Sequence, residues 1–368
     1  MLGFQPPAIG EEEIAAVTET LRSGWLTSGP SAAELERRTA EFLEAEHVLA
    51  LASGTAALHL SLVALGVGPG DEVITSPITW PATANVIVHT GATPVFVDVR
   101  EEDLNLDPTL AAAAVTERTK VILPVDLAGQ PADLDPLLEL GLPVIEDAAH
   151  AAESFYRGRK VGSIADATCF SLYATKNIAA GEGGLISTNR DDVAQAVLDL
   201  RQMRRGDGSI YDIPVPGYKA NLSDVLAAIA LCQLDKVERH REIRQRQFAL
   251  YDEGLAGLEG ITPLERDARD THALHLYAVR IDAAGEAGGT RDAYQHALGD
   301  ELIGTSIHFL PVHRLTWFRE RYPDQPRLPV AERAGDEVLS LPLSPAHSDD
   351  DIRDAVAAVH RVHERFTS

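Results

Sequence analysis

Cysteine is scarce in this chain of 368 residues, which holds only Cys169 and Cys232. Two cysteines cannot build a disulfide framework or a cysteine-rich metal cluster, and both stand among apolar neighbours, as buried thiols do. Basic side chains are in the minority too, because 32 lysines and arginines face 56 aspartates and glutamates, which gives a formal net charge of −24. Such an acidic surface disfavours nucleic acid and anionic membranes as partners.

Long uninterrupted hydrophobic runs are also missing. The most apolar segment, residues 49–67, is broken by Ser53, Thr55, His59 and Ser61, so we expect a buried helix there and no membrane span. The N-terminus has no basic region ahead of an apolar stretch, which argues against a secretory signal. These absences together predict a cytoplasmic protein with neither nucleic-acid nor membrane partners.

What the sequence does contain is a regular alternation of short β-type runs and helical segments. The expected strands are residues 71–75, 93–99, 121–127, 143–147, 167–172 and 184–188. The expected helices between them include residues 81–89, 108–118 and 134–140. Strands rich in valine and isoleucine at successive positions, separated by helices, predict a mainly parallel sheet covered on both faces. Because ligands bind at the carboxyl ends of the strands in such sheets, functional side chains are expected there.

A smaller domain is expected after this sheet. Residues 222–258 are predicted to be largely helical, with an apolar stripe that is typical of a helix leading out of a large domain. The segments that indicate a small α/β unit beyond it are residues 275–281, 304–308 and a final amphipathic helix at 349–363. We therefore expect a large domain at residues 1–245, which includes an N-terminal substrate and dimer segment, and a small domain at residues 246–368.

Several polar, small or aromatic residues stand at expected strand ends and loop starts. They are Ser53, Gly54, Thr55, Trp80, Asp147, Ser171 and Lys176. Pyridoxal 5′-phosphate (PLP) needs residues of these types: a helix N-terminus with small or hydroxyl residues for its phosphate, and a carboxylate that keeps its pyridine nitrogen protonated. Its aldehyde needs a desolvated lysine amine, and an aromatic side chain can stack on its ring. The set therefore predicts a PLP enzyme.

Each of these residues has a plain structural explanation when it is taken alone. Residues 53–55 could be a simple N-cap, Asp147 could be another cap, and Trp80 could be a core or interface residue. A lone lysine in a loop is usually solvated, but Lys176 follows an apolar strand and precedes the glycine-rich residues 181–184. An exposed loop has no need for that setting.

Five motifs, in order along the chain, resemble the DegT/DnrJ/EryC1/StrS family of sugar aminotransferases. They are residues 53–59, 70–75, 91–98, 146–150, and 175–177 followed by 181–184. The match covers nearly the whole chain from about Gly24. The resemblance implies an α/β protein with the fold of aspartate aminotransferase (PLP-dependent transferase fold type I), which has a mainly parallel seven-stranded sheet and a smaller C-terminal α/β domain. It also implies a homodimer with active sites shared at the interface.

Within the family, the sequence is most similar to the branch that aminates C4 of nucleotide-linked 4-keto sugars, typified by the 4-amino-4-deoxy-arabinose aminotransferases. The segments that carry this similarity are residues 24–30, 79–80, 216–221 and 307–309. The sequence departs from that branch at residues 204–214, where its loop is shorter.

The resemblance implies a role for each residue of the catalytic motifs. Lys176 would hold PLP as a Schiff base and move the proton between the substrate carbon and the cofactor. Asp147 would pair with the pyridinium nitrogen, and Trp80 would stack on the ring. His150 would lie against the ring or its 3-hydroxyl, and it joins Lys176 and Asp147 as a catalytic residue.

The remaining implied contacts concern the phosphate and the substrate. Gly54, Thr55 and Ser171 would hold the phosphate, and Asn221 resembles the residue that reaches it from the partner subunit. The expected substrate residues are His308, Lys219 and Thr27. Arg204, Arg205 and Lys219 are candidates for binding a diphosphate or a donor carboxylate, although they could equally be a solvated basic cluster.

Two histidines near each other in sequence raise the question of a metal. His308 could also be a packed strand histidine, and its spacing of five residues from His313 fits neither one face of a helix nor one side of a strand. No metal site is therefore predicted.

The expected reaction is PLP-dependent transamination of a nucleotide-linked keto sugar at C4 of a 4-keto pentose or deoxyhexose. L-glutamate is the expected donor, and the expected setting is amino-sugar biosynthesis in secondary metabolism. A 3-keto sugar or cyclitol aminotransferase stays open. A noncatalytic PLP-fold sensor or scaffold would be expected to lose Lys176 or Asp147, and the family's dehydratase branch has a histidine where Lys176 stands. A Rossmann NAD enzyme needs a different glycine spacing from that of residues 66–70.

Overall fold

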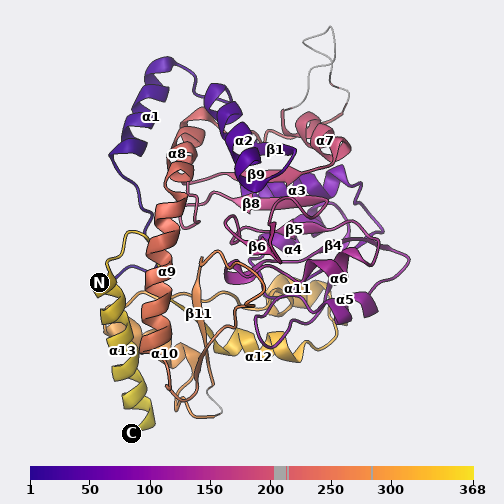
Figure 1. Ribbon diagram of the computed structural model, residues 1–368. Helices are drawn as coiled ribbons and strands as arrows, with labels where there is room; N and C mark the ends of the chain where they lie inside the picture. The colour runs from indigo at the N-terminus through magenta and orange to yellow at the C-terminus, as the bar shows by residue number, and fades with distance from the viewer. Residues whose placement is uncertain (203–212, 214, 283–284) are drawn as a thin grey trace.

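A sheet of parallel and antiparallel strands forms the centre of the N-terminal two thirds of the chain (Figure 1). The structure, a computed structural model, describes residues 1–202, 213, 215–282 and 285–368. The strands are β1 (His47–Leu51), β2 (Glu72–Thr75), β3 (Thr93–Phe96), β4 (Thr119–Leu123), β5 (Ile145–Asp147), β8 (Ala167–Ser171) and β9 (Gly184–Thr188).

Two sets of these strands join into one layer. The set β3-β2-β4 and the set β5-β8-β9-β1 meet through parallel bridges between Ile122 and Val144 and between Val125 and Asp147. Six strands share one direction, and β9 alone runs antiparallel to its neighbours β8 and β1. The predicted α/β class with a mainly parallel sheet is confirmed.

Helices cover both faces of the sheet because successive strand residues point to opposite sides. Val73 and Val121 pack with the helices of one face, whereas Ile74 and Ile122, the next residues along, pack with those of the other. The first face carries α3 (Gly54–Ala64), α4 (Ala82–His89) and α7 (Asp191–Gln202). The second carries α2 (Pro30–Leu43), α5 (Pro108–Ala113), α6 (Leu134–Leu138) and α8 (Asp224–Asp235).

A second core lies toward the C-terminus, around the antiparallel strands β10 (Ile261–Pro263), β11 (Tyr277–Ile281) and β12 (Val338–Leu341). Its helices are α9 (Val237–Gly254), α10 (Arg291–Asp300), α11 (Thr316–Arg321), α12 (Pro329–Glu337) and α13 (Asp349–Thr367). The N-terminal residue Leu2 packs against this core, and the N-terminus lies beside α13 (Figure 1). Helix α1 (Glu11–Ser23) stands apart from the sheet and packs on α8.

Some sequence predictions were wrong in detail. The expected helix at residues 49–67 begins only at Gly54, because residues 47–51 form strand β1; a short apolar run has no period that separates strand from helix. The expected strand at 304–308 is reduced to one bridge between Ser306 and Ser340. Residues 222–258 form two helices, which meet at Lys236.

Two further predictions concern the domain boundary and membrane-spanning helices. Helix α9 runs through residues 245 and 246, so the division there stays a prediction. None of the helices in the described residues combines the length and the hydropathy that crossing a bilayer requires.

Two buried carboxyl groups lie where β4 and β5 meet. Asp126 accepts a hydrogen bond from the Ala132 N–H at 2.8 Å, and Glu146 accepts one from the Thr168 hydroxyl at 3.0 Å. Their other oxygens, Asp126 Oδ2 and Glu146 Oε1, have no donor among the described residues. Burial raises the pKa of Glu146 to about 7, and burial together with the charge of Glu146 raises the pKa of Asp126 well above its usual value. At neutral pH the two carboxyl groups therefore share a proton.

Replacing Glu146 by glutamine is expected to change how stability depends on pH. The folded state keeps a proton that the unfolded chain releases above pH about 4.5, so the free energy of unfolding falls as pH rises from about 4.5 to about 7. In Glu146→Gln the amide donates to Asp126 and still accepts from Thr168. That variant should lose the part of the decline that Glu146 contributes and gain on the order of 1–3 kcal/mol at pH 8, as measured by urea unfolding of the apoprotein.

The control is Glu139→Gln at the exposed end of α6, which should unfold as the wild type does at every pH. A Glu146→Gln protein with the wild-type slope between pH 5 and 7 would show that the two carboxyl groups hold no shared proton.

Candidate active site

A cavity of about 500 Å³ opens at the edge of the sheet where the parallel strands end. Its walls come from residues at or after the ends of β1, β2, β4, β5 and β8. The antiparallel strand β9 begins at this same edge, so Gly183 just before it also lines the cavity. The opposite wall consists of residues 306–309 and of Phe4 and Gln5 from the N-terminal segment. Ligands of mainly parallel α/β sheets bind at this edge, where the strands end.

Most of the predicted site residues meet in this cavity. Those that line it are Gly54, Thr55, Trp80, Asp147, His150, Ser171, Lys176 and His308. Thr27, Lys219 and Asn221 are not part of its lining. The roles of all these residues stay predictions.

The N-terminus of α3 forms one end of the cavity. Ser53 caps the helix by accepting from the Ala56 N–H at 3.0 Å, and Gly54 and Thr55 lie in the first turn, whose N–H groups have no partner within the helix. A Cβ at position 54 would lie 3.1 Å from the Cβ of Ser171. Glycine therefore lets the helix start approach the end of β8 closely, and this end suits a phosphate.

Lys176 lies in the turn after β8, is partly buried and lines the cavity. Its backbone N–H donates to the Tyr173 carbonyl at 2.8 Å, which fixes the turn. Burial lowers the pKa of the amine to about 8, while the nearby carboxylate of Asp147 acts in the opposite direction. The amine can therefore lose its proton near neutral pH, as a nucleophile for an aldehyde must.

Asp147 is the last residue of β5 and is almost fully buried. Its Oδ2 accepts from the Thr83 hydroxyl at 2.7 Å, and its Oδ1 accepts from the Ala149 N–H at 3.3 Å. Burial raises the pKa of this carboxyl, and the two hydrogen bonds and the charge of Lys176 oppose that rise. A carboxylate in such surroundings gains from a cationic partner.

Three histidines surround the amine. His150 and His308 were predicted, and His275 was not; its only signal was a histidine at the start of an expected strand, with no spacing to mark it. Burial lowers the pKa of all three, that of His308 to about 3. The rings of His150 and His275 lie 4.4 Å apart between centroids. All three are therefore neutral at physiological pH.

Aromatic side chains also line the cavity. Trp80 keeps 65% of its surface exposed and lies 6.2 Å from the ring of Phe309, centroid to centroid. Phe4 stacks on His308 at 5.5 Å. Phe4 and Gln5 had no motif in the sequence, because long-range folding alone brings them to the cavity, whereas Phe309 belongs to the segment 307–309 that carries the resemblance to the C4 branch.

The remaining predicted residues form a separate exposed group. Asn221 donates from Nδ2 to the Ser28 hydroxyl at 2.6 Å, and Lys219 donates from Nζ to Asn221 Oδ1. The backbone carbonyl of Thr27 accepts from the Asp224 N–H at 3.1 Å. We call Thr27, Ser28, Lys219 and Asn221 the Asn221 group. Arg204 and Arg205 lie outside the described residues.

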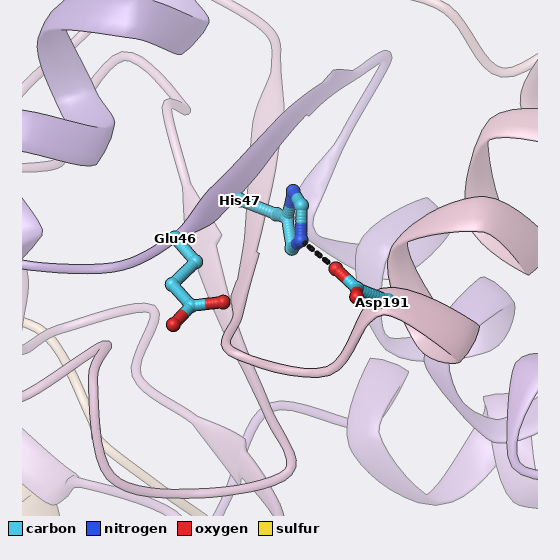
Figure 2. Close-up of side chains that lie close together, drawn as sticks. All are labelled: Glu46, His47 and Asp191. Carbon is cyan, nitrogen blue, oxygen red and sulfur yellow. Dashed lines mark hydrogen bonds and ion pairs between the residues drawn. The ribbon is translucent and has the colours of Figure 1, made fainter.

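Among the described residues, one trio places three possible metal-ligand atoms within 4.8 Å of one another: Glu46, His47 and Asp191. Figure 2 shows the His47 ring turned toward Asp191, whose Oδ1 lies 2.7 Å from Nε2. The trio lies at the start of β1 and of α7, away from the cavity lining, and both carboxylates are exposed. An ion pair on the surface explains it.

The cavity residues fit PLP group by group. The start of α3 matches the phosphate, Asp147 the pyridine nitrogen, and Lys176 the aldehyde, while Trp80 offers an exposed ring at the mouth. This match comes from the types and surroundings of the side chains that the folded chain brings together.

Comparisons with known proteins agree with this chemistry. The model of the DegT/DnrJ/EryC1/StrS aminotransferase family matches residues 7–360. The chain is 45% identical over 378 residues to the spore coat polysaccharide biosynthesis protein SpsC of Bacillus subtilis (strain 168), covering 98% of this chain and 97% of that protein.

Solved structures are similar over the same length. Spr1654 from Streptococcus pneumoniae, which has been solved in PLP and PMP forms, matches in its PMP form with a TM-score of 0.94 and 34% identity, covering 99% of this chain and 98% of that one. DesI, solved in the presence of its TDP-sugar product, matches with a TM-score of 0.91 and 33% identity, covering 99% and 93%. The chain therefore belongs to the DegT/DnrJ/EryC1/StrS aminotransferase family, and it is a PLP-dependent sugar aminotransferase of fold type I.

Proposed function

We propose that this enzyme transfers the amino group of L-glutamate to C4 of a nucleotide-linked 4-keto pentose or deoxyhexose, for amino-sugar biosynthesis. The observation that carries the proposal is that Lys176, which is partly buried, lines one cavity with Asp147 and the start of α3 at the strand ends and feels the charge of Asp147. The sugar part is supported by the TDP-sugar product of DesI and by the part in polysaccharide biosynthesis that the name of SpsC states.

Four residues of the cavity have a defined task in that reaction: Lys176, Asp147, Gly54 and Thr55. Bound PLP supplies an electron sink for the pair of electrons that is released when the α C–H bond of the donor breaks. Lys176 takes that proton on Nζ and would then pass it to the cofactor. An amine with a pKa of about 8 suits this task, because it can both accept and release a proton near neutral pH. Asp147 holds the proton at the ring nitrogen, and the N–H groups of Gly54 and Thr55 bind the phosphate.

The cavity has few cationic side chains for substrates that carry several negative charges. Among the described residues that line it, the charged ones are Asp147, Lys176 and Glu182. L-glutamate brings two carboxylates and a sugar nucleotide brings a diphosphate, so further cations must reach the site. The Asn221 group carries an exposed lysine, Lys219, that does not line the cavity of its own chain.

We therefore propose a homodimer in which the Asn221 group of one subunit completes the cavity of the other. Exposed apolar side chains on α1 and the segment after it support an interface there: Ile14, Leu21, Trp25 and Leu26. Apolar side chains gathered along one exposed segment are typical of a surface that another chain covers. Asn221 would reach the phosphate from the partner subunit, and Lys219 and Thr27 would reach the substrate.

The two half-reactions can be followed in the absorbance of the bound cofactor. L-glutamate should bleach the long-wavelength absorbance of the PLP-loaded protein, and a nucleotide-linked 4-keto sugar should restore it with formation of a 4-amino sugar. Recovery with a 3-keto sugar or a cyclitol instead would favour those alternatives. If glutamate bleaches the absorbance and no nucleotide sugar restores it, the sugar assignment is wrong and the PLP assignment stands.

Sharing of sites between subunits can be tested by mixing inactive variants. Lys176→Ala lacks the amine, and a Lys219→Ala/Asn221→Ala variant lacks the exposed group. Co-expressed chains should pair at random, so about half of the dimers contain one intact site and the mixture regains about a quarter of wild-type activity. A mixture no more active than the two variants assayed separately would show that each chain uses its own Asn221 group.

A further inference from the structure

Two buried threonine hydroxyls lie in line with the carboxyl group of Asp147. Thr83, in the first turn of α4, donates from Oγ1 to Asp147 Oδ2 at 2.7 Å, and Thr79 Oγ1 lies 2.7 Å from the same Thr83 oxygen. Both threonines are buried and line the cavity with Asp147. The bond to Asp147 therefore joins the helix that follows β2 to the end of β5, two strands away in the sheet.

The direction of these hydrogen bonds follows from the single proton that each hydroxyl carries. An ionised Asp147 can only accept, so the proton of Thr83 lies in the 2.7 Å bond to Oδ2. The backbone carbonyl of Trp80 is a more distant acceptor at 3.2 Å, and it already accepts from the Thr83 N–H. The proton between the two hydroxyls therefore belongs to Thr79. The resulting hydroxyl relay runs from Thr79 through Thr83 to Asp147.

The bond from Thr83 is the shorter of the two that the Asp147 side chain accepts. The other comes from the Ala149 N–H to Oδ1 at 3.3 Å, which lies outside the usual range of such bonds. A hydroxyl that itself accepts a hydrogen bond is polarised and donates more strongly. Because a hydrogen bond to the ionised form of a carboxyl group favours that form, Thr83 opposes the rise in the pKa of Asp147 that burial causes.

We propose that Thr83 is a positioning residue of this aminotransferase: with Thr79 behind it, its hydroxyl fixes Oδ2 of Asp147 and keeps that carboxyl group ionised at neutral pH, as pairing with the pyridine nitrogen of PLP requires. The inference rests on the proposed role of Asp147. Its consequence is that one short segment serves two parts of the cofactor site, because Trp80 stands between the two threonines in the chain.

Other titratable groups surround Asp147, and none of them changes when only a threonine is replaced. Lys176 attracts the carboxylate, whereas Asp126 and Cys169 are affected by its negative charge. The groups concerned are Lys176 in the turn after β8, Cys169 of β8, Asp126 after β4, Glu146 of β5 and His150 after β5. A change in the titration of Asp147 in a threonine variant therefore reports the contribution of the hydroxyl.

Three substitutions separate the hydroxyl of Thr83 from its shape. Thr83→Val keeps the branched side chain and removes the donor, whereas Thr83→Ser keeps the donor and removes a methyl group. Thr79→Val leaves the bond to Asp147 and removes only the hydroxyl behind it. The matched control is Thr75→Val on β2, because Thr75 is a buried threonine outside the cavity lining, and its hydroxyl donates to the Leu123 carbonyl at 2.8 Å.

The dissociation constants of the full-length apoprotein are measured for PLP and for its 1-deaza analogue, in which a carbon atom replaces the pyridine nitrogen. The analogue has nothing for Asp147 to pair with, so the ratio of the two constants reports that pairing. Thr83→Val should reduce the preference for PLP by about tenfold, and Thr79→Val should reduce it by less. Thr83→Ser and the Thr75→Val control should keep the wild-type preference within about twofold.

An unchanged preference in Thr83→Val, or an equal loss in Thr83→Ser or in Thr75→Val, would overturn the proposal. If the wild-type protein and Asp147→Asn show the same preference between the two compounds, the proposed role of Asp147 fails instead, and the relay is then judged on the apoprotein alone.

A second measurement does not depend on the cofactor. The ¹³C carboxyl signal of Asp147 in the NMR spectrum of the apoprotein, assigned by its absence in Asp147→Asn, reports the pKa of this group directly. Thr83→Val should raise that pKa by about one unit, and Thr83→Ser should leave it within about 0.3 units of the wild-type value. An unchanged pKa in Thr83→Val would overturn the proposal and leave Thr83 as a packing residue.

Discussion

The rest of the site depends on the electrostatic attraction between the partly buried amine of Lys176 and the carboxylate of Asp147. Removing the charge of a lysine from water costs free energy unless another group stabilises that charge. Here burial lowers the pKa to about 8, and Asp147 limits the fall. An amine balanced in this way can hold or release a proton near neutral pH, which a solvated lysine with its usual pKa does not do. Both the capture of an aldehyde and the transfer of a proton need that property.

The fold brings these groups together at one edge of the sheet. Five strands that run in the same direction end at one edge, and the single antiparallel strand, β9, starts there. The start of β9 lies very close to the start of α3, because a Cβ on Gly184 would lie 2.3 Å from the backbone of Ser53. The start of β9 therefore presses against the residue that caps α3, and glycine is the residue that allows it.

The parts of the site that could be predicted are those encoded in local sequence. Asp147 and Lys176 stand at the ends of strands that short apolar runs predict, and residues 53–55 begin a helix. Because ligands bind at the carboxyl ends of parallel strands, these residues were expected to meet at one edge of the sheet. His275 and Phe4 could not be found in this way, because they come from segments distant in sequence that reach the cavity only after the second core has packed. Strand β1 was missed because its four apolar residues, 48–51, are too few to show a period that separates strand from helix. Asn221 lies outside the cavity lining of its own chain, and its proposed contact with the phosphate requires a second chain, which no local pattern describes.

The position of the cofactor bond tests this account most directly. The PLP-loaded protein is reduced with borohydride and digested, and the modified lysine is identified by mass spectrometry. The account predicts one reduced adduct, on the peptide that contains Lys176, and its loss in Lys176→Ala. Lys160 is a strict internal comparison, because burial lowers its pKa to about 8 as well, yet it lies away from the cavity lining. An adduct on Lys160 or Lys219, or one that survives in Lys176→Ala, would contradict the account.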